Sequence, residues 1–400
     1  MGESHHTVRN DELRMPLGPR RAPAPAVAAA ATTADSGQER PGLRAAAQEF
    51  VDAGFAGIQV RVHDEQGDWV GSAGVRELGG TAGPPTDGAF RVGSSTKTFV
   101  ATLVLHLVAE GAVGLDEPVA DHLPGFTLDR RITVRMLLQH TSGLFNFTGE
   151  YYPDGTIVPG IPWQGREWVE KRFHSYRPED LVRLSLSKPA RFEPGADWSY
   201  SNTNYVLAAL LIEQVAGRPY GEEMERRILR PLGLRDTLVP GARSDVPGPH
   251  AHGYHRYQDA ADQWKTLDVS RQNPSWISAA GEMISTTKDL ATFVSALTGG
   301  GLLPEPLLAE MRTPHPGSGE HHYGLGLFVQ DLGPGRGGTV LHHNGGVNGY
   351  ATLMYATPDG KRTLTASVTT GDAAVDLVHE FPKLRDRLVE EVFRGGRAAQ

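Results

Sequence analysis

The spacing of apolar residues changes twice along the chain, and this change limits the folds that the sequence can adopt. Residues 57–63 alternate apolar and polar side chains, and residues 69–75 follow after a polar turn, as in an antiparallel hairpin. Near the other end, residues 339–343, 350–356 and 361–369 again have strand character, with Pro-Asp-Gly between the last two. Strands at both ends of a long middle section predict one sheet to which both ends contribute.

The middle of the chain has helical periodicity instead. From Phe99 to Val108, apolar side chains recur every four residues until Gly111, which predicts a buried helix that begins at or near Ser94. A last amphipathic helix is predicted through residues 377–392. The predicted fold class is α/β (α+β): an antiparallel sheet flanked by helices, with a helical subdomain inserted between its strands.

Domain boundaries follow from the same patterns. Residues 1–40 are rich in Pro and Ala and lack periodic apolar positions, so we expect a disordered N-terminal segment. Residues 41–396 form one predicted domain. We expect its sheet subdomain at about 45–93 and 320–396 and its helical subdomain at about 94–319.

Composition excludes several kinds of chemistry. The 400-residue chain has no cysteine, which excludes disulfides, thiolate metal sites and a cysteine nucleophile. Its 39 Lys+Arg against 47 Asp+Glu give a net charge of −8, which disfavours nucleic acid as a partner. No apolar run reaches the roughly 20 residues that cross a bilayer, and the signal-peptide pattern is unconvincing. We expect a soluble protein, secreted or cytoplasmic, with a small-molecule or peptide substrate and with its oligomeric state left open.

Without cysteine, nucleophilic chemistry points to serine, and one serine has a suitable setting. In Ser94-Ser95-Thr96-Lys97, Ser94 stands where a strand and a glycine lead into the predicted helix. Lys97 projects from the same helix face one turn later. A partly desolvated ammonium loses its proton more readily, so Lys97 is a candidate base for the Ser94 hydroxyl. The alternative is that Ser94 caps the helix and Lys97 points to solvent.

A second motif, Tyr200-Ser201-Asn202, lies between a Glu-Pro-Gly turn and a further helix. Tyr200 is a candidate for relaying protons between the serine and a leaving group. Asn202 is a candidate for orienting the lysine and a substrate amide carbonyl. The alternative is a half-buried core tyrosine followed by a helix N-cap.

A third motif, His343-Asn344-Gly345-Gly346, ends a predicted strand. Consecutive glycines there allow a ligand to approach the backbone closely. The amide of Gly346, together with that of Ser94, is expected to form an oxyanion hole.

The order and spacing of these motifs resemble the serine β-lactamase and penicillin-binding protein family. The most similar group comprises the D-alanyl-D-alanine carboxypeptidases, class C β-lactamases and family VIII esterases. Its motifs are Ser-x-x-Lys, Tyr-x-Asn and His/Lys-x-Gly, which are matched here at Ser94, Tyr200 and His343. Flanking stretches such as 132–144 are also similar, and the resemblance covers most of residues 45–395.

The resemblance implies a β-lactamase/transpeptidase-like fold and five catalytic residues. By this resemblance, Ser94 is the acyl-accepting nucleophile, and Lys97 and Tyr200 form the acid/base pair. Asn202 orients the substrate, and His343 is the group contributed by the third motif. The resemblance implies neither a cofactor nor a metal.

Substrate-binding positions are also implied, with some departures from the family pattern. Trp276 is expected to line the site, and Gly345 is expected to bind the substrate. The carboxypeptidases carry hydroxyl residues after the His and the Gly of the third motif, and an arginine about thirteen positions earlier, which together hold a terminal carboxylate. Here Asn344 and Gly346 replace the hydroxyl residues, and Phe328 is taken as the residue at the place of the arginine.

The sequence therefore predicts a cofactor-free serine hydrolase that forms an acyl-enzyme on Ser94. Its expected activity is like that of the carboxypeptidases: cleavage or transfer of a D-amino-acid peptide, amide or ester. Strict carboxypeptidase activity is in doubt without a charged clamp, unless Arg336 or Arg362 reaches the site. The alternatives are an esterase, a β-lactamase or a peptide-cyclising acyltransferase on the same site. A non-catalytic ligand-binding relative is a further alternative, against which the complete motifs argue.

A histidine-rich loop is the remaining candidate for a metal site. His250, His252 and His255 precede Asp259 in a stretch rich in Gly and Pro. Their spacing is typical of no particular metal, so no metal site is predicted.

Overall fold

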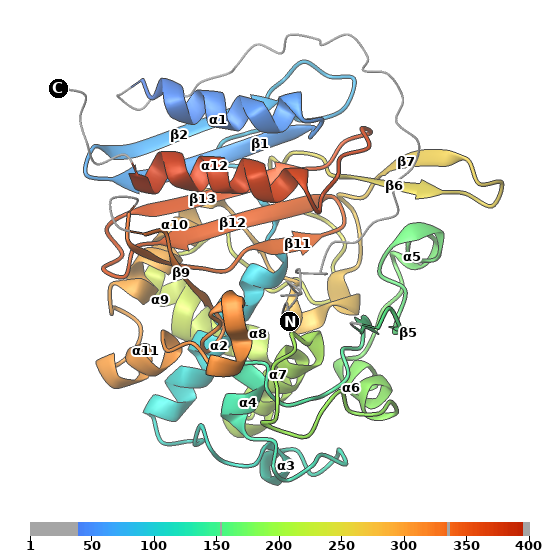
Figure 1. The fold of residues 1–400 in the computed structure, drawn as a ribbon, viewed down its shortest axis with the longest axis vertical. Coiled ribbons are helices and arrows are strands. Elements are labelled where there is room, and N and C mark those ends of the chain that lie inside the picture. Colours follow the sequence, from blue (N-terminus) through green and yellow to red (C-terminus); the bar gives the residue numbers. More distant parts are fainter. Residues whose placement is uncertain (1–38, 153, 334–336, 395–400) are drawn as a thin grey trace, which may run out of the picture.

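The computed structural model describes residues 39–152, 154–333 and 337–394. Its largest sheet is seven-stranded and antiparallel, in the order β2-β1-β13-β12-β10-β9, with β11 paired to β12 (Figure 1). Its strands are β1 (Gly57–Asp64), β2 (Gly67–Gly74), β9 (Phe328–Asp331), β10 (Thr339–His342), β11 (Gly345–Val347), β12 (Tyr350–Ala356) and β13 (Thr363–Thr369). Both ends of the chain thus build one sheet, as the apolar spacing predicts.

One face of this sheet is covered by the first and last helices, α1 (Pro41–Asp52) and α12 (Glu380–Arg394) (Figure 1). β1 pairs with β2 on one side and β13 on the other, so it lies inside the sheet. Val60 and Val62 of β1 are fully buried in the core that α1 and α12 close. The predicted hairpin and the predicted terminal helix are both confirmed.

The other face is covered by α10 (Thr287–Thr298), which packs on β13, β12 and β1. This helix falls within 94–319, the range expected for the helical subdomain, and it packs on the sheet. The physical reason is that the apolar side chains of α10 contact both the sheet and the helical part of the molecule. The ring of its Phe293 stacks on Phe99, with centroids 3.5 Å apart, while the same core includes Met354 of β12.

The remaining elements form the helical part of the molecule and several short hairpins. The helices are α2 (Thr96–Ala109), α3 (Val119–His122), α4 (Val134–Leu138), α5 (Gly165–Lys171), α6 (Pro178–Leu186), α7 (Asn202–Ala216), α8 (Tyr220–Met224), the π-helical η2 (Glu225–Leu229), α9 (Arg230–Leu232) and α11 (Glu305–Met311). The 3₁₀ turns are η1 (Gly93–Ser95), η3 (Pro274–Trp276), η4 (Ser278–Ala280) and η5 (Pro316–His321). The short strands pair as β3 (Phe90–Arg91) with β8 (Ile284–Ser285), β4 (Gly149–Tyr151) with β5 (Ile157–Pro159), and β6 (Tyr254–Gln258) with β7 (Trp264–Asp268).

Helix α2 lies at the centre of the helical part and packs against α7. It begins at Thr96, after the η1 turn, so Ser94 lies in the turn rather than in the α-helix. No helix in the described ranges is long and apolar enough to cross a membrane.

Arg91 fixes the strand that leads into Ser94. Its side chain is 1% exposed, and its guanidinium donates hydrogen bonds to the carbonyls of Ser244 (2.6 Å), Ser270 (3.0 Å) and Gln272 (3.1 Å). Burial lowers the pKa of Arg91 to about 10, so it remains charged at neutral pH. A long loop is thereby held against β3.

We expect Arg91→Met to lower the free energy of unfolding by about 3 kcal/mol, because buried carbonyl acceptors lose their donors. Urea unfolding followed by circular dichroism measures the change. Arg271→Met is the matched control on the same loop, since it removes only an ion pair of exposed side chains with Asp245. Equal unfolding midpoints for the two variants would contradict this role of Arg91.

Candidate active site

Two backbone segments from opposite ends of the chain meet at Ser94. Gly93 has a φ of +53°, and a Cβ there would lie 2.5 Å from the amide nitrogen of Gly346. A Cβ on Gly345 would lie 1.9 Å from the Val92 carbonyl oxygen and 3.0 Å from the Ser94 amide nitrogen. Glycines therefore permit this contact, in which the backbone of the third motif touches that of the serine motif.

Lys97 joins three separate segments around Ser94. It is 0% exposed, and its Nζ donates to Ser94 Oγ (3.1 Å), Asn202 Oδ1 (2.8 Å) and the Ala280 carbonyl (2.8 Å). Two of these partners can only accept, whereas the Ser94 hydroxyl can also donate. A neutral amine in this position would keep its two N–H groups on Asn202 and Ala280 and direct its lone pair at Ser94. The geometry thus fits Lys97 as the base for the serine.

The second motif lies directly against Lys97. The Tyr200 ring centroid is 4.5 Å from Lys97 Nζ. Asn202, the first residue of α7, donates from Nδ2 to Thr148 Oγ1 at 3.3 Å, and its backbone N–H donates to Asn146 Oδ1 at 3.2 Å. These contacts hold Asn202 from two sides while its Oδ1 accepts from Lys97.

His343 completes the group but is held in a neutral form. It is 1% exposed, and its Nδ1 is 2.8 Å from the Asn344 carbonyl oxygen, which can only accept, so Nδ1 carries the proton. Its Nε2 therefore accepts from the Tyr323 hydroxyl at 3.2 Å. Burial, and then the charge of Lys97, lower the pKa of His343 to about 3. Ser95 Oγ donates to the His343 carbonyl at 2.8 Å and ties this residue to the serine motif.

Two predicted substrate-binding residues have other neighbours in the structure. The side-chain amide of Asn344 donates to the Tyr355 hydroxyl at 2.9 Å, and Tyr355 belongs to the core beneath α12. Trp276 is 5% exposed at the end of η3 and lies in the core of the helical part. It is four residues before Ala280, the acceptor for Lys97.

A count along the sequence corrects the place assigned to the carboxylate clamp. The residue thirteen positions before His343 is Gln330, not Phe328. In the β9–β10 register, Phe328 is opposite His342, and Gln330 is opposite Val340. The Phe328 ring packs edge-on against His343, with centroids 5.1 Å apart. Neither Phe328 nor Gln330 supplies a positive charge.

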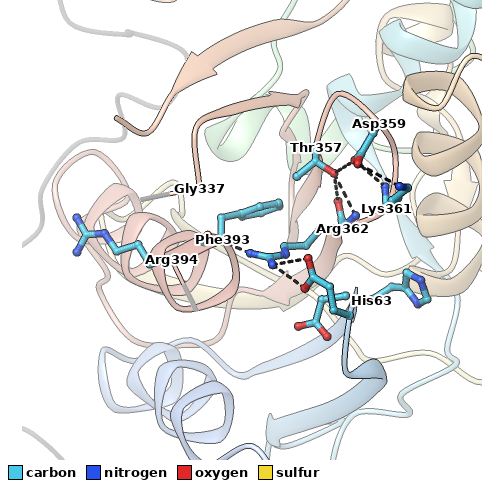
Figure 2. Close-up of a pocket in the computed structure, with 10 residues that line it drawn as sticks. His63, Gly337, Thr357, Asp359, Lys361, Arg362, Phe393 and Arg394 are labelled. Carbon is cyan, nitrogen blue, oxygen red and sulfur yellow. Dashed lines mark hydrogen bonds and ion pairs between the residues drawn. The ribbon is translucent and has the colours of Figure 1, made fainter. Parts of the chain in front are cut away.

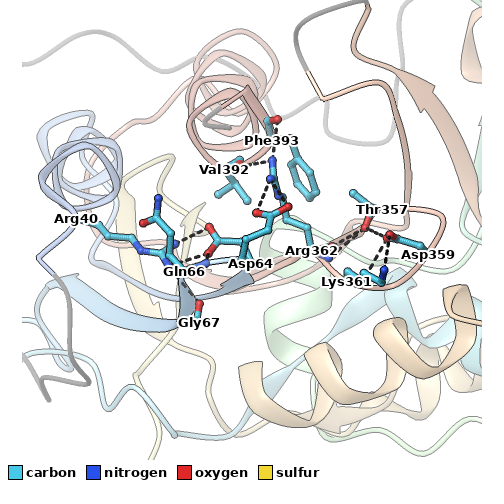
Figure 3. Close-up of polar contacts among 11 residues, drawn as sticks. Arg40, Asp64, Gln66, Gly67, Thr357, Asp359, Lys361, Arg362, Val392 and Phe393 are labelled. Atoms are coloured by element: carbon cyan, nitrogen blue, oxygen red, sulfur yellow. Dashed lines mark hydrogen bonds and ion pairs between the residues drawn. The ribbon is translucent and has the colours of Figure 1, made fainter. Parts of the chain in front are cut away.

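Arg362, the alternative clamp, lies at the opposite end of β12 from β11. It lines a surface pocket (Figure 2) with a volume of about 830 Å³. Its guanidinium donates to the Glu65 carboxylate at 2.7 and 2.6 Å. It also donates to the Phe393 carbonyl at 3.1 Å, at the end of α12 (Figure 3). These contacts tie Arg362 to the turn between β1 and β2 and to α12. Arg336 lies outside the described residues.

The described side chains of the histidine-rich loop are not arranged as metal ligands. His252 Nδ1 is 2.6 Å from Asp268, and the ring of His250 stacks on that of His252. His255 is buried and accepts from the Gly165 amide. Within the described ranges, no three His, Cys, Asp or Glu side chains come together as a metal site.

Comparison with known proteins identifies the family of the chain. The sequence model of the family described as Beta-lactamase matches residues 43–387. The chain belongs to the β-lactamase family. This finding confirms the resemblance of the three motifs, and the antiparallel sheet with flanking helices is the fold of that family.

The chain is similar to a penicillin-binding protein, an esterase and an amidohydrolase. Penicillin-binding protein 4* of Bacillus subtilis (strain 168) is 28% identical over 289 residues, which cover 70% of this chain but only 60% of that protein. Esterase EstB of Burkholderia gladioli is 29% identical over 309 residues, covering 67% of this chain and 74% of the esterase. A crystal structure of a D-stereospecific amidohydrolase from Streptomyces sp. is 38% identical, with a TM-score of 0.76, covering 90% of this chain and 100% of the other.

Several groups near Lys97 and His343 were not predicted from the sequence. The Ala280 carbonyl, the Thr148 hydroxyl and the Tyr323 hydroxyl each contact a predicted site residue. Ala280 and Tyr323 lie in stretches that resemble the carboxypeptidases, but that resemblance gives them no chemical role. A backbone carbonyl has no signature in sequence, because any residue type supplies it.

We expect Gly345→Ala to abolish covalent labelling of Ser94 by a fluorophosphonate, because its Cβ would clash with the Val92 carbonyl and push the Ser94 backbone away. The variant should also unfold at a lower temperature. Gly125→Ala is the control, since a Cβ there meets nothing within 4 Å. Intact-mass spectrometry and thermal unfolding measure both effects. Normal labelling of Gly345→Ala would show that this backbone contact is dispensable.

Proposed function

We propose that this protein is a serine hydrolase that cleaves amides or esters of D-amino acids through an acyl-enzyme on Ser94. The observation that carries the proposal is the set of Lys97 contacts with Ser94, Asn202 and Ala280. A buried lysine between a serine hydroxyl and two fixed acceptors is the arrangement that activates a serine.

The proposed reaction follows the geometry of these groups. Neutral Lys97 takes the Ser94 proton as Oγ forms a bond to the substrate carbonyl carbon. The negative oxygen that develops is stabilised by the backbone amides of Ser94 and Gly346. The proton passes through Tyr200 to the leaving amine or alcohol as its bond to carbon breaks. Water then attacks the ester of Ser94, which restores the serine and releases the acid.

Within residues 39–152, 154–333 and 337–394, Phe328, Gln330 and Arg362 place no positive charge at the site, which supports a substrate whose reacting end is uncharged. His343 is neutral, with each ring nitrogen in a hydrogen bond. Arg362 is bound to Glu65 elsewhere, and Gln330 carries no charge. A free carboxylate is bound strongly by bidentate charged contacts, so its binding here would lose much of its strength. The name of the Streptomyces amidohydrolase supports an amide and the D configuration.

An ester is the second candidate for the same site. Esterase EstB, which aligns over 67% of this chain, favours it by name. An ester also has an uncharged reacting end, and its alcohol leaves more readily than an amine. Transfer of the acyl group to an amine, including peptide cyclisation, requires only that an amine replace water in the second step.

We expect incubation with a fluorophosphonate or a β-lactam to add one adduct to Ser94, and Ser94→Ala to remove it. Lys97→Met should slow acylation by about 10³-fold or more, because the serine loses its base. Intact-mass and peptide mass spectrometry locate and time the adduct. An adduct on another serine in the wild-type protein would refute the proposed nucleophile.

We expect the amide of a D-amino acid to be hydrolysed in preference to its L enantiomer and to a peptide ending in D-Ala-D-Ala as the free acid. With the α-amino groups of both substrates acetylated, so that neither substrate titrates in this range, the ratio of kcat/KM for amide and free acid should stay constant from pH 5 to 8. The pKa of His343 is about 3, so His343 gains its positive charge only below that range. A ratio that shifts toward the free acid as the pH falls through 6 or 7 would show that His343 titrates there.

A further inference from the structure

His140 lies beneath the second motif, and its main chain and its side chain both contact that motif. It is 0% exposed and follows α4 with a φ of +65°. Its carbonyl accepts from the Ser199 amide at 3.0 Å, and its Nδ1 accepts from the Ser201 amide at 3.3 Å. These donors are the residues immediately before and after Tyr200, so His140 holds the chain on both sides of that tyrosine.

The His140 ring also contacts Tyr200 directly. The two ring centroids are 4.3 Å apart, with an angle of 35° between the planes. Tyr323, whose hydroxyl donates to His343, packs on the same imidazole with centroids 4.9 Å apart. His140 therefore contacts both the tyrosine of the second motif and the residue that holds the histidine of the third.

A hydrogen-bonded chain fixes the imidazole itself. Asn204 Nδ2 is 3.0 Å from His140 Nδ1, and Asn204 Oδ1 accepts from Ser142 Oγ at 2.6 Å. A backbone N–H such as that of Ser201 can only donate, so Nδ1 must hold a lone pair and the ring proton must be on Nε2. Burial, and then the charge of Lys97, lower the pKa of His140 well below its usual value. The ring is thus one defined neutral tautomer.

We propose that His140 is a positioning residue for Tyr200: by accepting the Ser201 and Asn204 donors on Nδ1, it sets the place of the Tyr200 ring against Lys97. This inference rests on the proposed function, in which Tyr200 moves a proton. A displacement of about 1 Å in a reacting group can cost about 10²-fold in rate. The Tyr200 ring has Lys97 Nζ 4.5 Å from its centroid, so a shift of Tyr200 alters the environment of the base as well.

Two substitutions separate the acceptor from the bulk of the ring. His140→Asn keeps an acceptor near the position of Nδ1, and asparagine tolerates a positive φ. His140→Leu keeps a similar volume and removes the acceptor. Leucine is also strained at a φ of +65°, so the NMR measurement on the wild-type protein carries the test of the acceptor alone. We expect His140→Leu to slow fluorophosphonate labelling of Ser94 by about 10²-fold, and His140→Asn to restore most of that loss. With a chromogenic ester, kcat should fall in His140→Leu while KM changes little.

Thr365→Val is the control for loss of a buried hydrogen bond far from the site. Thr365 is 0% exposed, and its Oγ1 donates to the Thr287 carbonyl at 2.8 Å between β13 and α10. It should lose stability and label at the wild-type rate. Normal labelling of a folded His140→Leu, or a rate for His140→Asn no better than that for His140→Leu, would overturn the positioning role.

Nitrogen NMR of the wild-type protein tests the same inference without a variant that must fold. We expect a neutral His140 with its proton on Nε2 from pH 5 to 9, and a proton on Nδ1 would overturn the assigned contacts. The two proposals fail differently. Absence of any Ser94 adduct in the wild-type protein would refute the proposed function, whereas the His140 tautomer tests the geometry independently of activity.

Discussion

The site depends on one constraint: a lysine that is removed from water must have acceptors for its N–H groups. Desolvation of an ammonium costs several kcal/mol unless such partners are present. Here the partners of Lys97 come from the η1 turn, the start of α7 and the end of η4. Each of these elements must therefore be held in place by the rest of the fold. The hydrogen bonds that replace water around Lys97 also direct its Nζ at Ser94.

The fold holds the serine turn in place by packing its backbone directly against the backbone of β11. Glycines at 93 and 345 allow the serine turn to lie against β11, and Ser95 adds a hydrogen bond to the His343 carbonyl. Arg91 holds the strand before the turn to a distant loop. The proposed nucleophile, Ser94, is thus carried on a turn that is fixed on both sides, which suits chemistry in which small displacements are costly.

The sequence was sufficient for the strand patterns, the buried helix and the three motifs, because alternating and four-residue periodicities report directly on burial. It was not sufficient to place α10 against the sheet, since an amphipathic pattern does not say which element the apolar face of a helix packs on. The direction of Asn344 also escaped prediction, because the chain between β10 and β11 is irregular and turns this amide toward Tyr355. The neutrality of His343 depends on burial and on Tyr323, which only the folded chain provides.

The contact between Gly345 and Val92 has a consequence for how the protein becomes active. About 250 residues separate these positions, so the loop that they close is among the longest in the chain, and contacts of this range generally form late and slowly in folding. During synthesis the serine motif leaves the ribosome long before the strands that it must touch. We expect the proposed site around Ser94 to remain unassembled in any nascent or truncated chain that ends before β11. Reactivity at the proposed site is therefore a sensitive reporter of complete folding. The strands that are synthesised last must be in place before the serine motif can act.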